Sequence, residues 1–103
     1  MATTKLICPC VHMNGTSKES LVRDYEAASS AIETAIGALM PTAPNGRDYY
    51  PYGERFAEQF EMAQHQFRDR ILKLQRVADE LELLINNTAS DIREQFVEIE
   101  NNE

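Results

Sequence analysis

Apolar residues recur through residues 16–40 at alternating steps of four and three, the spacing of one side of an α-helix. This narrow spacing resembles a coiled-coil seam more than the broad apolar stripe of a surface helix. Two of its members, Ala28 and Ala35, are small enough to let a neighbouring helix approach closely. The predicted seam consists of Leu21, Tyr25, Ala28, Ile32, Ala35 and Leu39.

The sequence marks both the start and the end of this helix. A turn pair precedes it, and Thr16 and Glu19 stand three residues apart, as in a capping box. The Thr16 hydroxyl would then accept a hydrogen bond from a free backbone N–H. Pro41 cannot continue a helix, so the helix is predicted to end at about Met40.

A second and longer helix is predicted over residues 54–86. Because it is longer than the first, part of its apolar seam would have no partner within an antiparallel hairpin. A homo-oligomer, such as a larger helical bundle, would cover that part. The predicted seam consists of Phe56, Phe60, Ala63, Phe67, Ile71, Leu74, Ala78, Leu81 and Ile85.

The remaining segments complete a single all-α domain over residues 1–103. Residues 1–15 are apolar and interrupted by Pro9, so we expect an extended arm that lies on the helices or on another subunit. Near the other end, Ile92, Phe96 and Ile99 share one side of a short helix predicted over residues 90–100. The fold class is therefore an antiparallel helical hairpin with an N-terminal arm and a short C-terminal helix.

The connector at residues 41–53 is about twice the usual length of a helix–helix connection. It contains three prolines and two glycines, a composition that argues against regular structure. Its length exceeds what joining two helices requires. We therefore expect the connector to contribute to binding.

Charge and hydropathy limit the classes of partner. The chain has 17 acidic and 10 basic residues, a formal charge of -7, so it lacks the basic surface that direct nucleic-acid binding needs. No apolar run approaches a membrane span, and no signal peptide is evident, so we expect a cytoplasmic protein with reduced cysteines. An acidic surface also permits mimicry of nucleic acid.

We predict neither a metal site nor a cofactor, and no catalytic residue. Cys8, Cys10 and His12 are zinc-ligand types, but their spacing is unusual and the other histidine, His65, is distant in sequence. No nucleophile signature or phosphate-binding glycine pattern occurs. The cysteines are better explained as small apolar residues of a docked arm.

Two segments are candidate binding sites. The first offers hydroxyls and backbone N–H groups at a helix N-terminus, which favours anions. The second places a guanidinium beside phenol rings, which suits phosphate and base recognition, a protein hot spot, or simple packing of the hairpin end. In one hairpin the two segments would lie roughly 35 Å apart, so a shared site needs two subunits. The candidate residues are His12, Asn14, Thr16 and Ser17 in the first segment, and Asn45, Arg47, Asp48, Tyr49, Tyr50 and Tyr52 in the second.

The same two segments, at residues 12–17 and 43–51, resemble motifs of small accessory proteins encoded in tailed-bacteriophage genomes. The resemblance covers residues 11–85 and implies expression in a bacterial cytoplasm, with no activity that transfers to particular residues. It favours a non-catalytic protein that binds a host or viral protein, for example to inhibit host defence. The alternatives are an oligomer that sequesters a nucleotide or another phosphorylated ligand, an acidic nucleic-acid mimic, and a virion assembly component.

Overall fold

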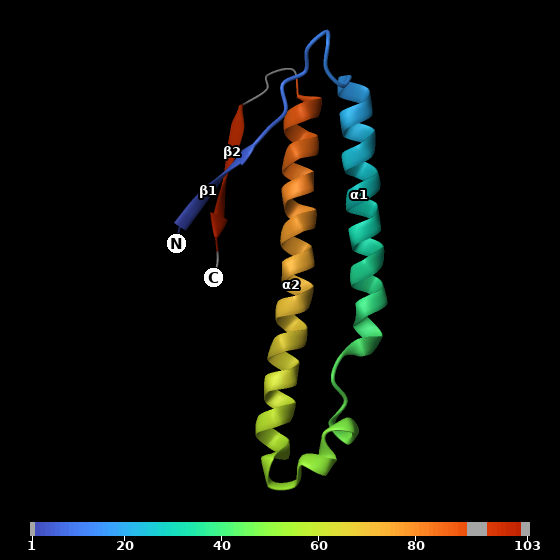
Figure 1. Cartoon of the computed structure of the whole chain (residues 1–103), viewed down its shortest axis with the longest axis vertical. Coiled ribbons are helices and arrows are strands. Elements are labelled where there is room, and N and C mark those ends of the chain that lie inside the picture. Colours follow the sequence, from blue (N-terminus) through green and yellow to red (C-terminus); the bar gives the residue numbers. More distant parts are fainter. Residues whose placement is uncertain (1, 91–94, 102–103) are drawn as a thin grey trace.

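The fold is dominated by two long antiparallel helices, α1 (Lys18–Leu39) and α2 (Phe56–Ala89) (Figure 1). The computed structural model describes residues 2–90 and 95–101. Its extents are 64 × 29 × 17 Å and its radius of gyration is 19.1 Å. A compact chain of this length would have a radius of gyration of about 13 Å. The predicted helical hairpin is therefore confirmed, and it is an extended one.

The seam predicted for α2 is confirmed along its full length. Each of its nine residues is half-buried, except Ala78, which is buried. These positions repeat close to the helical period of 3.6, so they stay on one side of the helix. α2 packs against α1, and at its start the seam residues Phe56 and Phe60 contact tyrosines of the connector. The other large apolar residues of α2, such as Met62, Leu72 and Val77, remain substantially exposed.

The seam predicted for α1 is wrong at its two alanines. Ala28 and Ala35 are exposed, whereas Ser29 and Ile36, one residue later, are half-buried. Because Ile36 has more apolar area to bury than Ala35, rotating the helix toward Ile36 is the more favourable arrangement. α1 therefore carries apolar residues, Ala28 and Ala35, outside its half-buried side.

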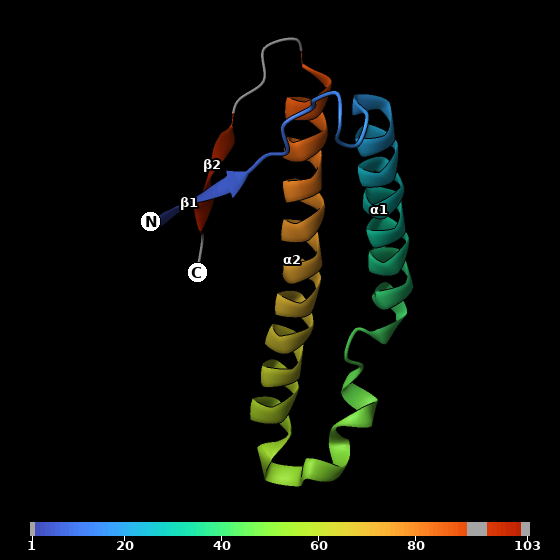
Figure 2. The same ribbon diagram turned by 45° about the horizontal axis from the view of Figure 1, so that its top comes forward.

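α2 continues three residues beyond its predicted end. Asn87 is buried and Thr88 is fully buried, and both belong to α2. The N-terminal arm runs past this end of α2, and its Cys8 is also buried (Figure 2). Burial at this end outweighs the weak helix propensity of asparagine and threonine.

The prediction of an all-α fold is wrong, because the two ends of the chain form a small sheet. Strands β1 (Ala2–Ile7) and β2 (Phe96–Asn101) pair antiparallel, with Leu6 opposite Val97 and Thr4 opposite Ile99. The predicted extended arm thus includes a strand. The two strands contact each other far more than they contact either helix.

The predicted C-terminal helix over residues 90–100 is wrong where the structure describes it. Residues 91–94, including Ile92 of the predicted apolar face, lie outside the described residues. From Phe96 onward the chain is strand, and half-buried Val97 and Ile99 alternate with exposed Glu98. β-branched residues at a spacing of two suit a sheet once a partner strand is available.

The molecule has very little interior. Within residues 4–90 and 95–99, the buried residues are Cys8, Ala78, Asn87 and Thr88. Three of these four lie at the open end of the hairpin, where the sheet and the arm are found. No helix in the described part of the chain has both the length and the hydropathy required to cross a membrane.

Candidate functional site

The connector between the helices is ordered as three short 3₁₀ turns. They are η1 (Met40–Thr42), η2 (Gly46–Asp48) and η3 (Tyr50–Arg55). The expectation that its prolines and glycines exclude regular structure is therefore wrong. Pro41 and Pro51 each occupy an early position of a turn, where the missing N–H is not needed.

A glycine makes the sharp bend that leads into α2. Gly53 has φ 63° and ψ −121°, a conformation that residues with a side chain strongly disfavour. A Cβ at this position would meet nothing within 4 Å, so the requirement for glycine comes from the backbone alone. The bend fixes how the aromatic residues before it face those after it.

Three tyrosines of the connector pack against the start of α2. Tyr49 lies 5.7 Å from Phe60 and 6.3 Å from Tyr52, between ring centroids, and Tyr50 lies 5.1 Å from Phe56. Phe56 and Phe60 stack on each other at 5.7 Å. The hairpin end is therefore closed by a continuous aromatic cluster. Even so, Tyr50 is 62% exposed and Tyr52 is 52% exposed.

Asn45 shapes the turn that carries Arg47. Its Oδ1 accepts a hydrogen bond from the Arg47 backbone N–H at 3.1 Å, and its carbonyl oxygen accepts one from Asp48 N–H at 2.9 Å. The Arg47 side chain is exposed, and among the described residues its guanidinium makes no ion pair, not even with Asp48 beside it. The turn thus holds the backbone of Arg47 and leaves its charge available.

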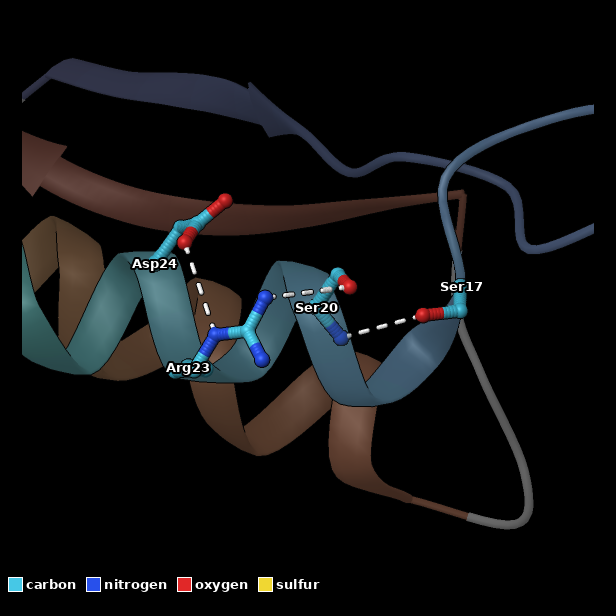
Figure 3. A network of polar contacts seen from close by, with 4 residues as sticks. All are labelled: Ser17, Ser20, Arg23 and Asp24. Carbon is cyan, nitrogen blue, oxygen red and sulfur yellow. Dashed lines mark hydrogen bonds and ion pairs between the residues drawn. The ribbon is translucent and has the colours of Figure 1, made fainter.

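The first candidate segment forms the N-terminal end of α1 (Figure 3). Ser17, not the predicted Thr16, caps the helix, and its Oγ accepts a hydrogen bond from Ser20 N–H at 3.2 Å. Arg23 donates to Ser20 Oγ at 3.3 Å and lies 3.9 Å from Asp24. The Ser17 hydroxyl is therefore already engaged within the helix.

The rest of that segment is an exposed turn. Gly15 N–H donates to the His12 carbonyl oxygen at 3.1 Å, and His12, Asn14 and Thr16 are exposed. The two candidate segments lie at opposite ends of the hairpin (Figure 1), as the topology predicts. Within one chain they do not form a common site.

A groove of about 340 Å³ lies beside the connector and was not predicted from the sequence. One wall comes from the connector and the other from α2. Its lining is largely apolar, with Arg68 and Gln64 as the polar members. In the sequence, Leu72 could have indicated this groove, because it is a large apolar residue that does not belong to the predicted seam. The lining residues are Met40, Ala43, Pro44, Gln64, Phe67, Arg68, Ile71 and Leu72.

The cysteines and histidines are dispersed. Cys8 is buried and its thiol lies 3.6 Å from the Leu6 carbonyl oxygen, whereas Cys10 is exposed. His65 lies on α2, 3.7 Å from Glu61. Among residues 2–90 and 95–101, no three side chains of ligand type come together to hold a metal ion.

The connector end therefore holds an exposed arginine beside aromatic residues, whereas in the other candidate segment Ser17 caps α1 and His12, Asn14 and Thr16 are exposed. Comparisons with protein-family models, with curated proteins and with solved structures find no match to this chain.

Proposed function

We propose that this chain is a non-catalytic binding protein that contacts a partner protein through its connector end. One observation carries the proposal: the guanidinium of Arg47, which makes no ion pair within the described part of the chain, stands on the same short connector as Tyr50 and Tyr52, each more than half exposed. Arginine and tyrosine are the residue types most enriched in protein hot spots. We refer to these three residues as the connector surface.

The connector surface is preorganised. Tyr49 is half-buried against Phe60, and Asn45 fixes the backbone of Arg47. Fewer backbone angles then need to be ordered when a partner binds, which lowers the entropic cost of association. A bound protein would cover the exposed sides of the Tyr50 and Tyr52 rings, whose other sides already pack against Phe56 and Tyr49.

The nature of the partner is proposed from the resemblance. A tailed-bacteriophage accessory protein would meet bacterial proteins, and we propose a component of host defence as the target. A carboxylate on the partner would match the planar guanidinium of Arg47. The chain would act as a homo-oligomer, since so much of its apolar surface is exposed.

A nucleotide-sequestering function would require a different assembly. Thr16 precedes α1 and Arg47 lies in η2, which are at opposite ends of the hairpin, so a shared ligand site needs two antiparallel subunits. Native mass spectrometry of the protein after exposure to a bacterial small-molecule extract tests this alternative. A discrete adduct that disappears in Arg47→Ala would favour sequestration over protein binding.

The proposal is tested by quantitative capture from a bacterial lysate. The immobilised chain is compared with the triple variant Arg47→Ala, Tyr50→Ala, Tyr52→Ala. The matched control is Arg23→Ala, which removes an exposed arginine at the opposite end of the hairpin. Circular dichroism establishes that each variant keeps its helices.

A protein retained by the wild type and by Arg23→Ala, but lost from the triple variant, supports the connector surface. Equal retention by all three chains contradicts it. Reversal of all captured binding by high salt, with no effect of the triple variant, would instead favour the acidic mimic.

A further inference from the structure

Within the described ranges, 2–90 and 95–101, the sheet at the open end has two strands and no third strand pairs with either, so both its edges are free. An isolated pair of strands is only marginally stable in water, and neither strand here is covered extensively by a helix. An uncovered edge presents unpaired N–H and C=O groups that pair readily with another strand.

The register of the sheet shows which backbone groups point outward. Cys8 N–H donates to the Gln95 carbonyl oxygen at 2.9 Å, which makes this a hydrogen-bonded pair. In an antiparallel ladder such pairs alternate with pairs that are not hydrogen-bonded. Ile7, opposite Phe96, and Lys5, opposite Glu98, therefore belong to the second kind. The N–H and C=O groups of Ile7 and Lys5 point away from β2, toward the free edge of β1.

The two edges differ in charge. The free edge of β2 is lined by residues of the Phe96 and Glu98 positions, so pairing two β2 strands would bring exposed carboxylates together. On β1 the sole charged residue is Lys5, and its ammonium lies over the Phe96 ring, 4.7 Å from the centroid. Lys5 therefore leans toward β2, and its charge does not oppose the approach of another strand to the free edge of β1. Beside it, Ile7 is 70% exposed.

We propose that the free edge of β1 pairs antiparallel with β1 of a second copy of this chain, about a two-fold axis at Leu6. The two sheets then become one four-stranded sheet, in the order β2, β1, β1 of the partner copy and β2 of the partner copy. The proposal concerns the end of the hairpin opposite the connector surface and does not rest on the function proposed for that surface.

The register about Leu6 follows from charge and from proline. It places Lys5 of each copy opposite Ile7 of the other, so the outward N–H and C=O groups of both residues are paired. Centring the axis on Lys5 would oppose two ammonium groups. Centring it on Ile7 would put Pro9, which has no N–H to donate, opposite Lys5 inside β1, whereas centring on Leu6 puts Pro9 opposite Thr3, near the end of the strand.

Side-chain packing favours the same register. Leu6 shares a face of the sheet with Val97 and Ile99, and all three are half-buried. Meeting of the two Leu6 side chains at the axis makes this apolar face continuous across four strands. On the opposite face, the exposed Ile7 gains a neighbour in the Lys5 stem of the other copy.

The exposed area of the chain leaves room for a second copy. The chain exposes 7641 Å², whereas a compact protein of its mass would expose about 5,900 Å². The excess is more than the area of roughly 800 Å² that each partner buries in an interface of standard size. Such an interface would still leave the connector surface of each copy free.

The first test removes one outward N–H group. Lys5→Pro deletes the donor that faces the free edge, while Lys5→Ala removes the same side chain and keeps the donor. Light scattering after size exclusion, with reductant present because Cys10 is exposed, measures the mass over a concentration series. We expect dimers for the wild type and Lys5→Ala, and at least tenfold weaker association for Lys5→Pro. Ala28→Arg, on the exposed side of α1, should leave the dimer intact.

The second test fixes the register by oxidation. In a Cys10→Ser background, Leu6→Cys places two thiols opposite each other at the axis, with Cα atoms about 4.5 Å apart, within reach of a disulfide. Ile99→Cys, on the same face of the outer strand, is the matched control. We expect a cross-linked dimer from Leu6→Cys and none from Ile99→Cys.

Three results would overturn the proposal. The first is a wild-type monomer at every concentration up to the millimolar range. The second is equal association of Lys5→Pro and Lys5→Ala. The third is a dimer that dissociates in Ala28→Arg but persists in Lys5→Pro, which would place the interface on the helices.

Discussion

The ring of Tyr50 lies against the ring of Phe56, with 5.1 Å between their centroids, while 62% of Tyr50 stays exposed. One side of the tyrosine is thus fixed by the first turn of α2, and the other faces solvent. The same residue contributes to the stability of the hairpin end and to the surface proposed for binding. Substitutions at Phe56 and at Tyr50 should therefore separate these two contributions.

Phe56→Ala should lower the free energy of unfolding by about 1–2 kcal/mol, because it removes the ring that both Tyr50 and Phe60 contact. Phe56→Leu retains most of the apolar volume and should cost less than half as much. Urea unfolding followed by tyrosine fluorescence measures the loss, since the chain has no tryptophan and three of its four tyrosines lie in the connector. Equal stability of both variants and the wild type would mean that the cluster is not packed as described.

Gly53→Ala should destabilise the chain by about 1–3 kcal/mol, since a Cβ is disfavoured at φ 63° even where there is space for it. Gly37→Ala is the opposite case, because Gly37 lies inside α1 with nothing within 4 Å of an added Cβ. That change should stabilise the chain by about 0.5–1 kcal/mol. Thermal unfolding by circular dichroism compares the two, and shifts of the same sign would contradict the backbone geometry at Gly53.

Thr88→Val should raise the free energy of unfolding by about 1–2 kcal/mol. Thr88 is fully buried and, among residues 2–90 and 95–101, no group hydrogen-bonds its Oγ1, so the hydroxyl loses its hydration without compensation from them. Thr88→Ser keeps the hydroxyl, loses a buried methyl group and should be destabilising. Chemical unfolding distinguishes them. A Val variant less stable than the wild type would show that the hydroxyl is satisfied in solution.

Ile36→Ala should destabilise the hairpin by about 1–2 kcal/mol, because Ile36 is a half-buried residue of α1, which packs on α2. Ala28→Leu should change stability by no more than about 0.5 kcal/mol, because Ala28 is exposed. Unfolding in urea with matched protein concentrations measures both. A large cost of Ala28→Leu together with a small cost of Ile36→Ala would restore the seam predicted from the sequence.

The periodic pattern predicted the helices because large apolar residues decide a helix face, and seven of the nine seam residues of α2 are large. In α1 the pattern included alanines, whose small apolar area allowed a rotation by one position toward Ser29 and Ile36. Thr16 and Ser17 are both capping residues, and sequence alone did not rank them correctly. The sheet was missed because Phe96 and Ile99, with Ile92, fit one side of a helix locally, and the partner of β2 lies some 90 residues earlier in the chain.

For the candidate site, the residue types of the connector indicated a binding surface, and the hairpin topology predicted that the two candidate segments would lie apart. The sequence did not reveal which tyrosines would pack, since Tyr49, Tyr50 and Tyr52 are chemically alike and differ only in their position relative to Phe56 and Phe60. The groove beside the connector depends on how Met40 and Pro44 lie over α2, which is a tertiary relationship.

The pairing of β1 with β2 joins residues almost a full chain length apart, and this sets an order for folding. Closing so long a loop costs more entropy than closing any turn of the hairpin. Once α1 and α2 have packed, however, their open end brings both strands close together (Figure 1). The sheet should accordingly be the last element to form and the first to open, with its amide protons exchanging before those of α2. Removal of a few residues at one end of the chain would then release the strand at the other.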